Sequence, residues 1–189
     1  VSFKIVPEAV KGVKVQPQTT KSILIRWKKS GNADGYHLYQ YKHGKYILIK
    51  KLKPYYTSIR VSKLKPGTIY KFKICSYKRI GEKNYEGKTK ALTGMTKVSA
   101  VKLKAKTKGK KIKLSWKKVR GAKGYEIYLS LKQNGKYKKL KRIASNKKTG
   151  YDYVIKKGGT FYIKVRAYSS SGSKKIYGAY SKVFKVAAK

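Results

Sequence analysis

Hydrophobic and polar residues alternate with a period of two through much of this chain. The clearest segment is 101–116, where Val101, Leu103, Ile112, Leu114 and Trp116 are separated mainly by lysines. Successive side chains of a β-strand point to opposite faces, so we expect one side of each segment to face a core and the other to face water. Such segments, separated by turns every 8–12 residues or so and without helical spacing, predict a β-sandwich or barrel with almost no helix.

The chain also repeats itself. The stretch around Trp27 aligns with the stretch around Trp116, and Gly35-Tyr36-His37-Leu38-Tyr39 aligns with Gly124-Tyr125-Glu126-Ile127-Tyr128. We infer two copies of one unit of roughly 90 residues. The expected domains are residues 1–97, with a core from about residue 7, and residues 98–189. The junction at 97–100 is short and lacks Gly and Pro, so we expect little pivoting there. The aromatic residues expected to form the two cores are Trp27, Tyr36 and Tyr70, and Trp116, Tyr125 and Phe161.

These motifs resemble tandem fibronectin type III domains, in particular the lysine-rich kind of bacterial surface and secreted proteins. The resemblance rests on the tryptophan followed by Gly-Tyr-x-hydrophobic-Tyr, on the corner Leu64-Lys65-Pro66-Gly67-Thr68-Ile69-Tyr70, and on Val165-Arg166-Ala167-Tyr168. It implies an all-β chain of two immunoglobulin-like β-sandwiches with about seven strands each. It also implies that the Tyr70 hydroxyl bonds back to the upstream backbone. The second copy has Phe161 at that position, so its corner lacks the hydroxyl and is expected to be looser.

The charge is extreme and one-sided. Lysine and arginine total 51 against 6 acidic residues, a formal net charge of +45, and both copies are strongly basic. Two explanations stay open: binding of polyanions, or tolerance of a drifting surface composition. The single cysteine, Cys75, excludes internal disulfides and Cys-rich zinc sites. No apolar run approaches the ~20 residues of a transmembrane helix.

Residues suited to catalysis are few. His37 and His43 occur only in the first copy, and alternation with Tyr36 and Leu38 predicts that His37 faces solvent. Cys75 is expected on an outer strand face, at the position of Arg166 in the other copy. Nearby lysines would favour the thiolate, but with no His or Asp arranged beside it the preferred interpretation is a half-covered packing residue. The six carboxylates lie far apart in the sequence, with Glu82 and Glu86 in one loop. We therefore expect no catalytic, cofactor-binding or metal-binding residues, no cofactor, and no enzyme activity.

Two kinds of surface are candidates for binding. The first is a set of basic residues that is also explained as a solvated strand face: Lys138, Lys139, Lys141, Arg142, Lys147 and Lys148, with Lys50, Lys51 and Lys53 in the first copy. The second is a set of outward tyrosines, Tyr39, Tyr41 and Tyr128, which would stack on sugars or bases.

The sequence thus predicts a non-catalytic spacer or interaction module of a larger bacterial cell-surface or secreted protein. Its expected partners are anionic polymers such as cell-wall teichoic acids and the other domains of its parent protein, and the fragment itself is expected to be monomeric. Two alternatives stay open. One is a module that binds nucleic acid or acidic polysaccharide, and the other is an accessory module of a secreted carbohydrate-active enzyme.

Overall fold

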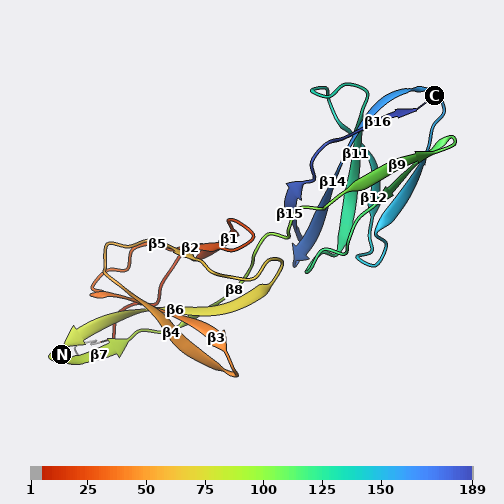
Figure 1. Cartoon of the computed structure of the whole chain (residues 1–189). Coiled ribbons are helices and arrows are strands. Elements are labelled where there is room, and N and C mark those ends of the chain that lie inside the picture. Colours follow the sequence, from red (N-terminus) through yellow and green to blue (C-terminus); the bar gives the residue numbers. More distant parts are fainter. Residues whose placement is uncertain (1–5, 189) are drawn as a thin grey trace. The chain divides into compact units, whose positions relative to one another are not determined.

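The computed structural model describes residues 6–188, and these residues form strands and turns without any helix (Figure 1). Residues 1–5 and 189, which the expected domains include, lie outside the described part. The chain divides into two compact units after Thr96. In the described range, no helix is long and apolar enough to cross a membrane.

Within residues 6–96 the first unit contains eight strands in two antiparallel sheets. One sheet has the order β1-β2-β5, and the other has the order β4-β3-β6-β7, with β8 also paired to β6. The strands are β1 (Lys14–Pro17), β2 (Ile23–Arg26), β3 (Gly35–Lys42), β4 (Lys45–Leu52), β5 (Ser58–Val61), β6 (Ile69–Ile80), β7 (Lys83–Glu86) and β8 (Lys90–Met95).

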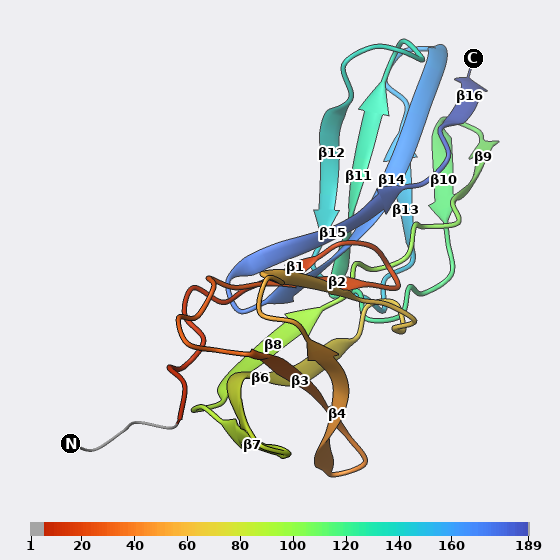
Figure 2. The same ribbon diagram turned by 90° about the vertical axis from the view of Figure 1, so that its left-hand side faces the viewer.

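The second unit repeats this arrangement. Its sheets have the orders β13-β10-β9 and β12-β11-β14-β15, and β16 also pairs with β14 (Figure 2). The strands are β9 (Lys104–Lys108), β10 (Lys111–Ser115), β11 (Gly124–Ser130), β12 (Lys138–Ile143), β13 (Gly150–Val154), β14 (Gly159–Ser171), β15 (Lys174–Tyr180) and β16 (Phe184–Ala188). In each unit the last strand of the sandwich is split into two pieces. The fold is therefore the expected pair of sandwiches, with seven strands each if the split strand is counted once.

A tryptophan and a tyrosine lie at the centre of each core. Trp27 meets Tyr36 edge to face at 5.3 Å between ring centroids, and Trp116 meets Tyr125 at 5.1 Å. The buried hydroxyl of Tyr36 accepts a hydrogen bond from the Ser30 N–H at 2.9 Å. Because large aromatic rings bury much apolar area, these pairs anchor the two sheets of each unit together. The expected cores are present, although Tyr70 is only half-buried; Phe161 is 5% exposed.

The corner before β6 has the predicted hydrogen bond. The Lys65 N–H donates to the Tyr70 hydroxyl at 2.7 Å, and Gly67 adopts a positive φ of 57° in the turn between them. Glycine suits that conformation because it carries no Cβ. Phe161 occupies the matching place in β14 and supplies no hydroxyl, so the second corner lacks this bond.

The glycine that opens the third strand of each unit is required by close packing. A Cβ on Gly124 would lie 2.2 Å from the Ile143 carbonyl oxygen, and one on Gly35 would lie 2.3 Å from that of Leu52. This close approach brings β11 against β12 and β3 against β4, and so shapes the outer face on which the polar residues described next are placed.

Candidate functional site

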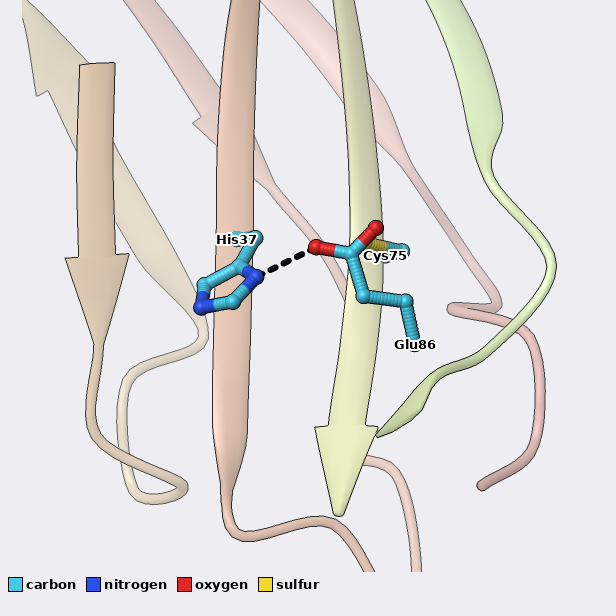
Figure 3. Close-up of side chains that lie close together, drawn as sticks. All are labelled: His37, Cys75 and Glu86. Atoms are coloured by element: carbon cyan, nitrogen blue, oxygen red, sulfur yellow. Dashed lines mark hydrogen bonds and ion pairs between the residues drawn. The ribbon is translucent and has the colours of Figure 1, made fainter. Parts of the chain in front are cut away.

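A cluster of three polar side chains, two of them buried, lies on the outer face of the larger sheet of the first unit. It consists of His37 on β3, Cys75 on β6 and Glu86 at the end of β7, and we call it the His37 cluster (Figure 3). The strand register pairs His37 with Cys75 and Tyr77 with Glu86, so three neighbouring strands bring these side chains together. His37 is 5% exposed and Cys75 is fully buried.

The Glu86 carboxylate is the centre of the His37 cluster. His37 Nδ1 is hydrogen-bonded to Glu86 Oε1, and the Tyr39 hydroxyl donates to the same oxygen. One face of the His37 imidazole is covered, because the ring stacks on Tyr77 with ring centroids 4.4 Å apart. His37 Nε2 is buried and has no hydrogen-bond partner in the described structure.

These contacts correct the prediction for His37 and decide between the two interpretations of Cys75. His37 does not face solvent, because Tyr77 and Glu86 cover the outer side of β3. Cys75 does lie on the outer face, at the register position that Arg166 holds in the second unit, but it is not a thiolate. Burial, together with the nearby Glu86 charge, raises the pKa of the Cys75 thiol to about 12. A buried, protonated thiol is a poor nucleophile, so the cluster is not arranged for covalent catalysis.

Glu86 itself stays ionised. Burial acts to raise the pKa of Glu86, but hydrogen bonds from Tyr39 and His37 outweigh it and lower the pKa below its usual value. The sequence pattern places Glu86 in a loop, whereas in the structure it ends β7 opposite Tyr77.

The equivalent face of the second unit carries a different network, which we call the Glu126 cluster. Glu126 replaces His37 and is fully buried. Arg166 donates to its Oε2 at 2.8 Å, Arg142 donates to its Oε1 at 3.0 Å, and the Tyr128 hydroxyl donates to Oε2 at 2.8 Å. Lys139 Nζ lies 3.4 Å from Oε1. The carboxylate therefore has cations on two sides.

Those donors decide the charge of Glu126. Burial alone would raise its pKa, but the hydrogen bonds from Arg166, Tyr128 and Arg142 lower it to about 2. Glu126 is thus ionised at every physiological pH, and the Glu126 cluster acts as a fixed ion-pair network across β11, β12 and β14.

The candidate polyanion-binding residues are all exposed, but they are not equivalent. Lys138, Lys139, Lys141 and Arg142 lie on β12, Lys147 and Lys148 lie between β12 and β13, and Lys50, Lys51 and Lys53 lie on or just after β4. Arg142 and Lys139 already pair with Glu126. Those two are therefore less free to meet an external anion than their neighbours.

The outward tyrosines are less available for stacking than predicted. Tyr128 is only 9% exposed, and Arg166 and Tyr180 pack against its ring. Tyr39 is half-buried and bonded to Glu86. Tyr41 is 42% exposed, with Tyr46 against one edge of its ring. The expectation of a stacking face is thus wrong for Tyr128, and Tyr41 is the accessible member of the three.

A second basic surface is visible only in the structure. On the smaller sheet of the second unit, Lys106 lies directly opposite Lys113, and Lys108 lies directly opposite Lys111. With Lys104 these residues form what we call the lysine ladder. Like charges directly opposite on a sheet repel, so the ladder costs stability unless anions screen it. Asp152 on β13 lies opposite Lys113 and offsets part of this repulsion. The period-two lysines of 102–113 are the signal in the sequence, but the strand register is needed to place them face to face.

A family model and one solved tandem structure agree with the fold. Residues 8–91 match the family model of the fibronectin type III domain. A two-domain fibronectin type III segment of chicken tenascin is 19% identical and has a TM-score of 0.54, and the match covers 96% of this chain and 99% of that one. The FN1–FN3 domains of chicken CNTN1 are 16% identical, with 98% and 67% covered and a TM-score of 0.47. No curated protein matches the chain. The two units are fibronectin type III-like sandwiches.

Proposed function

We propose that the two units form a non-catalytic spacer and interaction module of a bacterial cell-surface or secreted protein, and that the module binds anionic polymers such as wall teichoic acids. Fibronectin type III domains are commonly non-catalytic modules of this kind, which supports the coarse assignment. The fold alone does not name a ligand, so the polymer is argued from the surface.

The observation that carries the proposal is the excess of cations without carboxylate partners. Among residues 6–188, five lysine or arginine side chains form ion pairs with carboxylates: Lys11, Lys78, Lys139, Arg142 and Arg166. The sequence holds 51 such side chains. Because the remaining charges repel one another, an anionic polymer that lies along them relieves that repulsion and gains Coulomb energy.

The lysine ladder is the surface best suited to such a polymer. It aligns cations in two adjacent rows on β9 and β10, and a pocket of about 470 Å³ lined by Lys104, Lys106, Lys113 and Asp152 lies beside them. Rows of point charges match the repeated phosphates of a linear polymer and need no base-specific or sugar-specific contact.

Binding to purified wall teichoic acid, measured over a range of salt concentrations, tests the proposal. We expect affinity that falls steeply as salt rises, because bound counterions are released from the polymer. Replacing Lys104, Lys106, Lys111 and Lys113 by Gln should make that salt dependence shallower, by roughly one unit of log–log slope for each phosphate that the variant no longer neutralises.

A charge-matched control separates the ladder from the overall charge. The variant with Lys138, Lys141, Lys147 and Lys148 changed to Gln loses the same four charges on another surface, and we expect it to keep more of the salt dependence. Equal losses in both variants would refute the role of the ladder, and no binding at low salt would refute the function. Stronger binding to DNA than to teichoic acid would favour nucleic acid as the ligand.

A further inference from the structure

The three ligand-type atoms of the His37 cluster lie within 4.8 Å of one another. The ligands of one tetrahedral zinc ion, bound at about 2.0–2.3 Å, are separated by roughly 3.3–3.6 Å. Each side chain comes from a different strand, so small rotations of Glu86, which is at the end of β7 and a third exposed, close the remaining gap.

We propose that His37, Cys75 and Glu86 bind a single transition-metal ion of the zinc type. An imidazole, a thiol and a carboxylate are donors that such ions accept, whereas calcium and magnesium prefer oxygen ligands alone. The Tyr39 hydroxyl donates to the Glu86 oxygen that is also hydrogen-bonded to the imidazole, so it lies beside the proposed ligands.

The second unit provides an independent argument. By strand register, Cys75 occupies the place of Arg166, and Lys51 occupies the place of Arg142. In the second unit the two guanidinium groups neutralise the buried carboxylate. In the first unit the ion pair that Glu86 makes within residues 6–188 is with His37, whose charge depends on protonation. A metal ion in the His37 cluster supplies the permanent positive charge that arginine supplies in the Glu126 cluster.

Binding rearranges the protons of the site in a defined way. The thiol proton of Cys75 leaves to solvent, because the thiolate is the ligand. The imidazole binds through Nδ1 as the neutral ring, and its proton sits on Nε2. Nε2 has no acceptor in the described structure, so we expect a weaker site than one in which a second residue holds that proton.

A cobalt titration of the untagged, reduced and chelator-treated protein tests the site. We expect one equivalent of Co²⁺ to bind, with a thiolate-to-cobalt charge-transfer band and the intense visible bands of tetrahedral cobalt, and we expect Zn²⁺ to displace it. Cys75→Ser should lose the charge-transfer band. His37→Gln and Glu86→Gln should each weaken binding at least about tenfold.

The matched control is His43→Gln, because His43 is exposed in the turn after β3 and should not affect binding. Amide chemical-shift changes on adding Zn²⁺ to the wild-type protein should centre on His37, Cys75 and Glu86, and this readout does not depend on any variant folding. No charge-transfer band, equal binding by Cys75→Ser, or shifts centred on His43 would overturn the proposal.

Salt separates this site from the proposed function. Added salt screens the +45 charge that repels a metal cation, so it should not weaken metal binding as it weakens polymer binding. Metal binding can therefore be refuted while polymer binding is confirmed, and polymer binding can be refuted while metal binding is confirmed.

Discussion

The Glu126→Gln variant removes the charge at the centre of the Glu126 cluster while keeping the shape of the side chain. In the wild type the carboxylate accepts hydrogen bonds from Arg166, Arg142 and Tyr128 and is fully buried. The amide leaves two guanidinium groups facing each other without an anion between them. We expect the second unit to lose stability, because the loss of one partner leaves charges that are only partly solvated.

The pKa of Glu126 gives the magnitude. A shift from the ordinary 4.5 to about 2 corresponds to a contribution of about 3 kcal/mol to the free energy of unfolding. Because the folded-state pKa is lowered, this contribution is complete above about pH 4.5 and is lost as the pH falls towards 2. Removing one partner of a buried pair typically costs 3–5 kcal/mol. Arg142 is 39% exposed and recovers some hydration, so about 3 kcal/mol is expected for the variant at neutral pH.

Urea unfolding measures the loss. The substitution Trp27→Phe is introduced into both the reference protein and the Glu126→Gln variant, so that Trp116 remains as the fluorescent reporter of the second unit. Glu82→Gln, which changes an exposed carboxylate, is the control and should alter stability by less than about 0.5 kcal/mol. Between about pH 5 and pH 2 the reference should lose the Glu126 contribution and the variant should not. A cost below about 1 kcal/mol at neutral pH, or the same acid-dependent decline in both proteins, would refute the reasoning.

Packing and burial lead to three more predictions. Gly124→Ala should lower the free energy of unfolding by about 2 kcal/mol or more, because the added Cβ meets the Ile143 carbonyl oxygen. The control Gly31→Ala, whose Cβ has no atom within 4 Å, should change that free energy by less than about 0.5 kcal/mol. Equal effects of the two variants in calorimetry would contradict this. Tyr70→Phe should cost about 1 kcal/mol and speed amide exchange at Lys65, and unchanged exchange would count against the corner bond. The Cys75 thiol should react with a disulfide reagent far more slowly in the native protein than in urea, and rapid native reaction would show that it is accessible.

The fold was predictable because the chain contains two copies of one unit, which can be aligned with each other. Two copies of the tryptophan and Gly-Tyr motifs fix which residues face each core, and Trp27 and Trp116 are 5% and 6% exposed as that pattern requires. The corner hydrogen bond of Tyr70 was predictable from the resemblance to fibronectin type III domains, which implies this bond for a tyrosine that follows a Leu-x-Pro-Gly-Thr corner.

The polar clusters were not predictable from alternation. Alternation gives the direction of a side chain but not what covers it. The outward His37 is covered by Glu86, which ends β7, and β7 is one of the two pieces into which the last strand of the sandwich is split. One signal was present in the sequence: the position of His37 holds a titratable residue in both copies. A titratable group that recurs on a strand face suggests a partner on the neighbouring strand, but only the register identifies Arg166 as that partner.

The divergence of the two outer faces has a consequence for chimeric proteins. The two copies share their sequence motifs, yet their matching strands contribute to different networks. Strand β6 contributes Cys75 to the His37 cluster, whereas β14 contributes Arg166 to the Glu126 cluster. Grafting β14 into the first unit would set a guanidinium opposite His37, and the reciprocal graft would set a neutral thiol opposite the buried Glu126 carboxylate. We therefore expect recombination between these repeats to preserve each network only when β3, β6 and β7, or β11, β12 and β14, are inherited as a block.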